Sequence, residues 1–314
     1  MFVTRQDASP LRIGTRGSPL ALVQANDVRV RLLARFPELA ERGVAIEVIK
    51  TSGDRIQDRN LSEIGGKGLF TKEIEEALFE RHIDLAVHSM KDMPTVLPPG
   101  LSLAAVLPRE DARDVLISAT ATTLAALPQG TVVGTSSLRR RALLLHRRPD
   151  LRIVDFRGNV DTRLGKLRDG VAEATILARA GLNRLGRDDV AGALLAPEDF
   201  LPAVAQGIVT IECRDDDRDT RAMVAALGDV DTQCCADAER ALLLLLDGSC
   251  RTPIAGYAVH EKDGLWLRGL VVAPDGSKAI AGERRGPTSD AEALGSDLGR
   301  ELLSNAGDIL AALQ

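Results

Sequence analysis

The chain has 314 residues, 45% of them hydrophobic and 27% charged, with a formal net charge of −5, which suits a globular protein of two or three domains. Its longest apolar run, at 241–246, is too short to cross a bilayer, and no basic start followed by an apolar stretch marks a secretory signal, so we expect a cytoplasmic protein without membrane contact. Cys213, Cys234, Cys235 and Cys250 lack the paired spacing of a zinc site or a disulfide framework, so we expect no metal.

Apolar strands, short polar turns and amphipathic helices alternate along the first two thirds of the chain. A strand at 11–15 precedes a helix from about Leu20, and a second strand from 44 precedes a glycine-rich loop and helix at 65–80. After a strand at 84–88, further strand and helix pairs are expected within 131–149, 151–167 and 173–186, and another strand within 204–213. This alternation predicts two parallel α/β sheets.

The chain after about Asp229 has a different pattern. A helix at 236–246 precedes two hairpin-like strands, at 254–260 and 265–272, and a final helix, which together predict a small α+β domain. We therefore expect one α/β domain from 8–107 and 205–226, a second from 113–200, and a C-terminal α+β domain from 229–314.

Polar side chains follow several of the predicted strands. In parallel α/β sheets, ligands bind beyond the carboxyl ends of the strands. Arg16, Asp92, Ser137, Arg157 and Arg184 all fall at such positions, which makes them candidate site residues.

The segment DLAVHSMKDMP, at 84–94, changes at its middle from an apolar strand to four polar side chains. These are His88, Ser89, Lys91 and Asp92. A solvated loop would explain them, and so would a site that needs a carboxylate and an ammonium at a strand end.

The chain is strongly basic between Arg139 and Arg168, although its overall charge is negative. This segment contains nine arginines, Lys166 and three aspartates, which gives it a net charge of +7. The planar guanidinium group matches carboxylate and phosphate geometry, so the segment indicates an anion. Nucleic acid is the rival reading, but single-strand binders need aromatic platforms and only Phe156 lies in this segment. We expect a small polyanion and no nucleic acid.

The sequence GTSSLRR predicts a helix that begins after Ser137. Its first turn combines unpaired backbone N–H groups with Arg139 and Arg140, which repel each other unless an anion lies between them. A capped surface helix is the alternative reading.

Two glycine-containing loops carry a further candidate each. GGKG, at 65–68, does not match the nucleotide-binding loop because Leu69 follows it. It predicts either a flexible entry to a helix or a loop from which Lys67 faces a cleft. Cys250, in DGSC, follows the expected end of a helix, where a cysteine can react, although most cysteines are structural.

Eight segments match one family in order and spacing: RIGTRGSPLAL, GGKGLFTKEIE, DLAVHSMKDMP, VVGTSSLRRRA, RGNVDTRL, AGLNRLG, AVAQGIVTIECR and LDGSCRTPIAGYA. Between about 11 and 310 the chain closely resembles the porphobilinogen deaminase family, whose members are also called hydroxymethylbilane synthases. The resemblance implies two α/β domains similar to type II periplasmic binding proteins and a smaller α+β domain that carries a dipyrromethane cofactor on a cysteine. It also implies head-to-tail condensation of four porphobilinogen molecules with loss of ammonia, hydrolytic release of hydroxymethylbilane, and a monomer.

The resemblance also assigns roles to residues of this chain. It implies that Asp92 is catalytic and that Cys250 holds the cofactor through a thioether. It further implies cofactor contacts by Lys91, Ser137, Arg139, Arg140 and Arg163, and substrate contacts by Arg16, Lys67, Ser89, Arg157, Arg184 and Gln206. His88 is a less favoured base, because the motif assigns the chemistry to Asp92.

Three positions depart from the family pattern. Gly17 stands in place of Gln, Glu63 in place of Lys, and Ser249 in place of a second Gly before the cysteine. Two other classes of protein stay open: a solute-binding or regulatory protein of the same fold, and a nucleic-acid binder. The first would not carry a covalent group on a cysteine, and the second would show salt-dependent binding to DNA.

Overall fold

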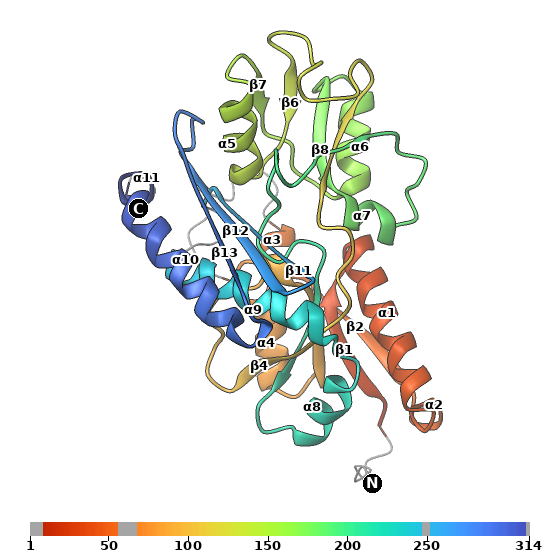
Figure 1. Ribbon diagram of the computed structural model, residues 1–314. Helices are drawn as coiled ribbons and strands as arrows, with labels where there is room; N and C mark the ends of the chain where they lie inside the picture. The colour runs from red at the N-terminus through yellow and green to blue at the C-terminus, as the bar shows by residue number, and fades with distance from the viewer. Residues whose placement is uncertain (1–8, 56–67, 247–251, 312–314) are drawn as a thin grey trace. The chain divides into compact units, whose positions relative to one another are not determined.

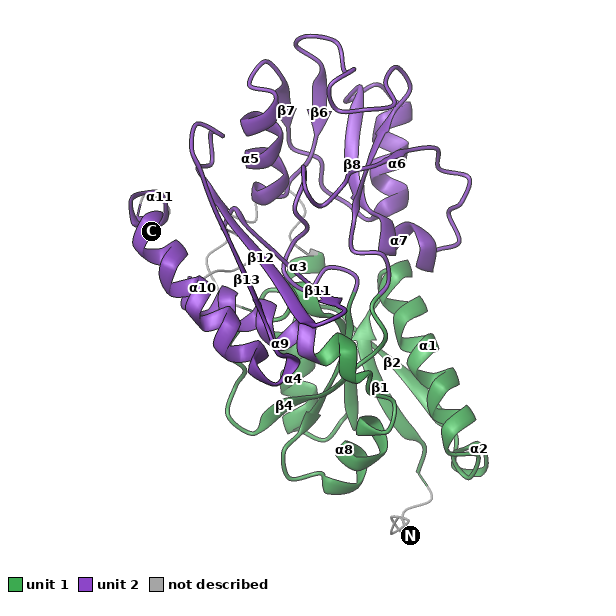
Figure 2. Cartoon of the chain, viewed as in Figure 1, with its two compact units in different colours: residues 1–56, 66–109, 208–233 green, residues 57–65, 110–207, 234–314 purple. Residues whose placement is uncertain are grey.

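The computed structural model describes residues 9–55, 68–246 and 252–311. The chain forms two compact units: unit 1 comprises 1–56, 66–109 and 208–233, and unit 2 comprises 57–65, 110–207 and 234–314 (Figure 2). Within the described residues the chain passes between the units after Arg109, after Gly207 and after Gln233. The domain bounds expected from the sequence stay a prediction.

Unit 1 is built around a five-stranded sheet with the strand order β2-β1-β3-β10-β4. Figure 1 labels its strands β1, β2 and β4. Its elements are β1 (Leu11–Arg16), α1 (Pro19–Arg35), α2 (Leu39–Arg42), β2 (Val44–Ile49), α3 (Ser52–Arg55), α4 (Lys72–Phe79), β3 (Leu85–Ser89), the 3-10 turn η1 (Met90–Asp92), β4 (Leu101–Val106), β10 (Val209–Arg214) and α8 (Arg218–Ala225). Pro19 opens α1 and the Ser18 hydroxyl caps it by accepting from the Ala21 N–H. Buried aliphatic side chains of β1, α1 and β10 form the core, among them Ile13, Val28 and Ile211.

Unit 2 contains a second five-stranded sheet, with the order β7-β6-β8-β5-β9. Its elements are β5 (Asp114–Ser118), β6 (Val132–Gly134), α5 (Leu138–Arg147), β7 (Arg152–Val154), α6 (Val160–Arg168), β8 (Ala174–Ala178), α7 (Arg179–Arg184) and β9 (Ala193–Leu194). Val133, Leu143 and Ile176 belong to its core. Helix α5 buries Ala142, Leu143 and Leu144 in this core, and its arginines lie at the start and end of the helix.

Both sheets are mixed, so the expectation of purely parallel sheets is wrong. β1 pairs in parallel with β2 and β3, but β10 runs antiparallel to β3 and β4. In unit 2, β6 is parallel to β7 and β8, whereas β5 is antiparallel to β8 and β9. A crossover helix is what makes neighbouring strands parallel. β10 and β5 each follow directly after the chain has passed from one unit to the other. Among the described elements, no crossover helix connects either strand to the strands beside it.

The rest of unit 2 is a three-stranded antiparallel sheet, β11-β12-β13, with helices packed against it. Its elements are α9 (Val230–Leu245, which begins in unit 1), β11 (Ile254–Glu261), β12 (Gly264–Val272), β13 (Ala279–Gly286), the 3-10 turn η2 (Thr288–Asp290), α10 (Ala291–Asn305) and α11 (Gly307–Ala311). The sequence predicted β11 and β12 but missed β13, an edge strand whose sequence, AIAGERRG, has few apolar residues. The expected class, two α/β parts with a smaller C-terminal α+β part, is confirmed.

Candidate active site

An open pocket lies in unit 1 at the carboxyl ends of β1 and β3. These two strands are parallel, so the side chains that end them meet at one edge of the sheet. The polar side chains that line the pocket are those of Arg16, Ser18, Gln24, Thr71, His88, Ser89 and Asp92. Three of the predicted site residues, Arg16, Ser89 and Asp92, are therefore brought together.

Arg16, the last residue of β1, is held in place by two neighbours. Its Nη2 lies 2.5 Å from Asp54 Oδ1, and its guanidinium lies 4.2 Å from the centre of the Phe70 ring. Burial raises the pKa of Asp54, but hydrogen bonds from Arg16 and Thr51 outweigh this and lower it below its usual value. Arg16 is thus a fixed cation at the pocket, and its protein partner Asp54 was not found from the sequence.

Asp92 reaches the pocket because β3 ends at Ser89 and the chain turns at once into η1. The carboxylate is only partly buried, so it is accessible from the pocket. Ser89 exchanges hydrogen bonds with buried Gln24: the Gln24 Nε2 donates to Ser89 Oγ at 2.9 Å, and the hydroxyl lies 3.2 Å from Gln24 Oε1. Lys91 is half-buried in the same turn but does not line this pocket.

In unit 2, Ser137 caps α5 as predicted, since its hydroxyl accepts from the Arg140 N–H. Arg139 and Arg140 follow in the first turn, but both are only 5% exposed. Arg139 Nη2 donates to Asp114 Oδ2 at 2.7 Å, and Arg140 Nη2 donates to Asp114 Oδ1 at 2.8 Å. A buried carboxylate of the protein itself therefore lies between these two arginines.

The remaining Nη atoms of the two arginines also have protein acceptors. Arg139 Nη1 donates to the Leu201 carbonyl oxygen and Arg140 Nη1 to that of Ile176. Gln206 is 1% exposed and donates to Asp114 Oδ1 at 2.9 Å and to the Ala112 carbonyl oxygen. Because of these contacts, neither arginine can offer both of its Nη atoms to a ligand. The Gln206 amide N–H groups are likewise already used. Cofactor or substrate contact by these three residues stays a prediction.

The other predicted residues of unit 2 lie at or near the same sheet edge. Arg157 and Arg163 are half-buried, and Lys166 Nζ donates to the Arg157 carbonyl oxygen at 3.0 Å. Arg184 ends α7 instead of directly following a strand, and its Nη2 donates to the Gly207 carbonyl oxygen at 2.7 Å. Arg184 therefore contacts the segment through which the chain leaves unit 2.

Some predicted residues lie outside the part of the chain that the structure describes. Lys67 and Cys250, together with the departures Glu63 and Ser249, lie outside the described residues. Gly17 is described and exposed, and a Cβ at this position would lie 3.1 Å from Val48 Cγ1, so Gly avoids a tight contact there.

The sequence did not point to four residues that position the predicted site residues. Asp54 and Phe70 contact Arg16, Gln24 contacts Ser89, and Asp114 contacts Arg139 and Arg140. Asp114 had one available signal, because an aspartate at the start of an apolar strand has to find a cation when it is buried. Among the described residues, no three His, Cys, Asp or Glu side chains gather as metal ligands. No helix in the described part of the chain is long and apolar enough to span a membrane.

Comparison with known proteins places the chain in a family. Two family models match it: porphobilinogen deaminase, dipyromethane cofactor binding domain, over residues 11–222, and porphobilinogen deaminase, C-terminal domain, over residues 233–304. Porphobilinogen deaminase of Paracoccus denitrificans is 57% identical over 298 residues, 95% of each chain. The chloroplastic porphobilinogen deaminase of Pisum sativum is 53% identical and covers 97% of this chain, which spans 84% of that protein.

Similarity to solved structures is much weaker. An arginine-specific periplasmic binding protein of Salmonella typhimurium matches 70% of this chain over 91% of its own length, with 16% identity and a TM-score of 0.41. The two family models together span most of the chain, and its relatives share more than half of its residues, so the chain belongs to the porphobilinogen deaminase family.

Proposed function

We propose that Asp92 is the catalytic carboxylate of a porphobilinogen deaminase and that Arg16 helps to hold the carboxylates of its substrate. The observation that carries this proposal is the pocket at the carboxyl ends of β1 and β3, where Arg16, Ser89 and Asp92 meet. The chain has the dipyrromethane cofactor-binding domain of its family and acts in tetrapyrrole biosynthesis.

The residues present fit a dipyrromethane group. Each pyrrole ring of the cofactor carries an acetate and a propionate, so the group needs cations and N–H donors. Ser137 at the start of α5, half-buried Arg157 and Arg163, and Lys91 beside Asp92 are side chains of this chemistry. The Nε atoms of Arg139 and Arg140 are buried and have no hydrogen-bond partner among the described residues. When bound, the cofactor supplies the pyrrole carbon from which the chain of rings grows.

Asp92 would act on the porphobilinogen ring. Loss of ammonia leaves positive charge that is shared with the ring nitrogen, and a nearby carboxylate stabilises this charge. The same carboxylate can accept the proton that the attacking pyrrole carbon releases. Lys91 cannot replace it, because an ammonium would repel these cations, so Lys91 is assigned to carboxylate binding.

The cations would orient the substrate. Arg16 is already fixed by Asp54 and Phe70, so it loses little side-chain freedom when a substrate carboxylate binds. Ser89, oriented by Gln24, can donate its hydroxyl to the same ligand if it releases Gln24 Oε1. Lys67, Arg157 and Arg184 keep the substrate-binding roles that the family pattern implies. Gln206 can take its implied role only if its amide releases Asp114 or the Ala112 carbonyl oxygen.

The proposal includes attachment of the cofactor to Cys250, a monomeric enzyme, and a cytoplasmic location. The intact mass of freshly purified protein tests the attachment. We expect a mass above that of the bare polypeptide by one dipyrromethane, lost in Cys250→Ala and retained in the control Cys234→Ala, which changes a cysteine of α9 in the same unit. A bare mass in active protein, or an unchanged increment in Cys250→Ala, would contradict it.

A further inference from the structure

Three buried titratable side chains lie at the wall of the Asp92 pocket or behind it. They are His88 on β3, Glu212 on β10 and Glu75 on α4, and each is less than 10% exposed. His88 lines the pocket, whereas the two glutamates do not. Burying two carboxylates and an imidazole is costly unless they share protons, so this group requires an explanation.

His88 and Glu212 are directly paired. His88 Nε2 lies 3.0 Å from Glu212 Oε2, and the side chains are 5% and 0% exposed. The pairing follows from strand register, because β3 and β10 are antiparallel neighbours and His88 lies opposite Thr210, two residues from Glu212. A carboxylate oxygen can only accept, so Nε2 is the protonated nitrogen and Nδ1 is the basic one when the imidazole is neutral.

The glutamates are incompletely hydrogen-bonded. Glu212 Oε1 and Glu75 Oε1 are buried and have no partner among the described residues. Burial raises the pKa of Glu75, and the charge of Glu212 raises it further, while His88 has the opposite influence. The raised pKa makes Glu75 easier to protonate than an exposed glutamate.

The His88–Glu212 pair offers a place for one proton. When the Glu212 carboxylate is ionised, a proton on His88 completes a neutral ion pair with it at 3.0 Å. The other charged groups that line the same pocket are Arg16, which is paired with Asp54, and Asp92 itself. Asp92 is therefore the carboxyl on this pocket wall from which His88 can receive a proton.

We propose that His88, backed by Glu212, relays the proton that Asp92 accepts during each condensation. The proposal rests on the proposed function of Asp92. The C–H bond at the attacking pyrrole carbon breaks, its electron pair stays in the ring, and the proton passes to the Asp92 carboxylate. It then moves to His88 Nδ1, directly or through water, and finally to the ammonia that the same cycle releases, which leaves as ammonium. Asp92 returns to its anionic form before the next ring is added.

The relay predicts a specific kinetic result for His88→Gln. The glutamine amide can still donate to Glu212, but it cannot take up a proton. We expect kcat to fall about 10- to 100-fold, at or below the lower end for general acid–base catalysis, with little change in KM. We also expect one ionisation to disappear from the pH profile of kcat. A residue that only supports the fold would lower the melting temperature without removing an ionisation.

His82→Gln is the matched control, because His82 is in the same unit and is exposed, with Glu80 as its partner. It should leave kcat and the pH profile unchanged. Glu212→Gln is the second variant: it keeps the shape but removes the charge, and should shift the ionisation of His88 to lower pH.

The decisive readout does not depend on activity. The chain has four histidines, so 15N-labelled histidine gives few NMR signals, and the signal lost in His88→Gln is that of His88. We expect the Nε2–H tautomer and a titration that moves to lower pH in Glu212→Gln. An Nδ1–H tautomer, an unchanged titration, or a His88→Gln enzyme with the kcat and pH profile of wild type would overturn the relay. Wild type that releases no ammonia from porphobilinogen would instead contradict the proposed function.

Discussion

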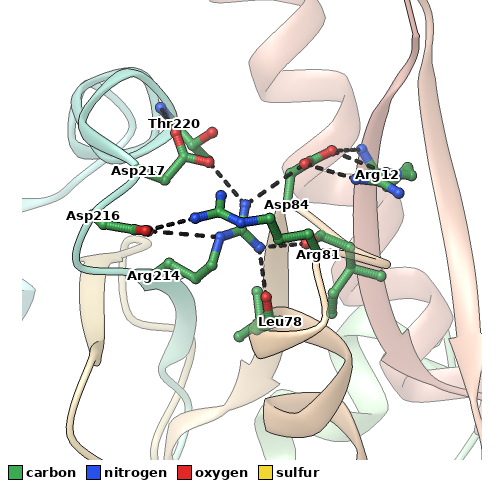
Figure 3. A network of polar contacts seen from close by, with 9 residues as sticks. Arg12, Leu78, Arg81, Asp84, Arg214, Asp216, Asp217 and Thr220 are labelled. Carbon is green, nitrogen blue, oxygen red and sulfur yellow. Dashed lines mark hydrogen bonds and ion pairs between the residues drawn. The ribbon is translucent and has the colours of Figure 1, made fainter.

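Each unit contains a buried cluster of arginine and aspartate side chains, and the two clusters lie at different edges of their sheets. In unit 1, Asp84 directly precedes β3 and receives three hydrogen bonds from Arg12, near the start of β1 (Figure 3). In unit 2, Asp114 is paired with Ala178, the last residue of β8. The first cluster is at the amino ends of parallel strands and the second is at a carboxyl end, where ligands bind.

The cluster of unit 1 is balanced in charge. Arg214 Nη2 lies 2.9 Å from Asp217 Oδ2 and 3.7 Å from Asp84 Oδ1, and its Nη1 donates to two carbonyl oxygens, those of Leu78 and Ile83 (Figure 3). Two arginines thus face two buried aspartates, and the group joins β1, β3, β10 and α8. These contacts hold the elements of unit 1 together, so we interpret the cluster as structural.

The cluster of unit 2 has an excess of positive charge, since Arg139 and Arg140 share the single carboxylate of Asp114. Both arginines belong to the first turn of α5, whose N-terminus adds further partial positive charge. The comparison shows that the same residue types can fix a sheet at one edge and supply a positive potential at the other. Position in the fold distinguishes the two cases, and composition does not.

Asp114→Asn is expected to have the largest effect on stability. It would leave two buried arginines without an anion, and breaking such a pair costs about 3–5 kcal/mol. Denaturant unfolding should show this loss, while Asp155→Asn, an exposed control in the same unit, should stay close to wild type. A loss below about 1 kcal/mol would mean that Asp114 does not hold the arginines.

The pH dependence of this effect has a definite sign. Burial raises the pKa of Asp114, but Arg139 and Arg140 lower it further than burial raises it, so the folded pKa is below the unfolded one. Its stabilising contribution is therefore complete above the unfolded value of about 3.9 and is lost as the pH falls below it. The difference between wild type and Asp114→Asn should shrink in that acid range.

Arg140→Lys is expected to cost about 2–3 kcal/mol of stability, because lysine keeps the charge but cannot bind Asp114 and the Ile176 carbonyl together. Arg152→Lys, at an exposed position of the same unit, is the control and should be neutral. Arg148, in the same basic segment, is unsuitable as a control. It pairs with Asp150 and donates to carbonyl oxygens that include those of Leu124 and Leu127.

Asp84→Asn should cost less than Arg140→Lys, about 1–2 kcal/mol. Arg214 keeps Asp217, and Arg12 is partly exposed, so water can replace part of what it loses. Unfolding measurements check the magnitude. Activity per folded molecule should stay within a few-fold of wild type, and a large loss of activity would show that the amino-edge cluster affects the reaction.

Glu75→Gln should have the smallest effect, and its sign depends on pH. Because burial raises the folded pKa of Glu75, its contribution to stability is complete below the unfolded value and is lost as the pH rises through the folded one. Glutamine does not ionise, so the variant should gain stability relative to wild type as the pH rises from 4 to 8. Unfolding at both pH values tests this, and a variant that becomes relatively less stable at pH 8 would contradict it.

The sequence was sufficient for several of the elements and for the strand ends that carry polar side chains. Alternating apolar segments located β1, β3, β6 and β8, and the GTSS motif predicted the cap of α5 at Ser137. These features depend on residues close together in the chain. Ser89 and Asp92 were found for the same reason, since the end of β3 and the turn η1 are adjacent.

The sequence was not sufficient for partners that are far apart. Asp114 is 26 residues from Arg140, and Glu212 is 124 residues from His88, so no local pattern links them. The antiparallel insertion of β10 between β3 and β4 creates the second contact, and it was missed when parallel sheets were predicted. The sequence therefore predicts an external anion at Arg139 and Arg140, and the structure adds Asp114 as a buried carboxylate between them.

The most direct test of the account compares two aspartates at opposite edges of the same sheet. Single-turnover condensation of porphobilinogen by Asp92→Asn and Asp84→Asn, with circular dichroism to measure the folded fraction, separates catalysis from stability. We expect Asp92→Asn to be folded and at least about 10²-fold slower, and Asp84→Asn to be less stable but nearly as fast as wild type per folded molecule. A folded Asp92→Asn enzyme that turns over within a few-fold of wild type would contradict the assignment of the reaction to this pocket.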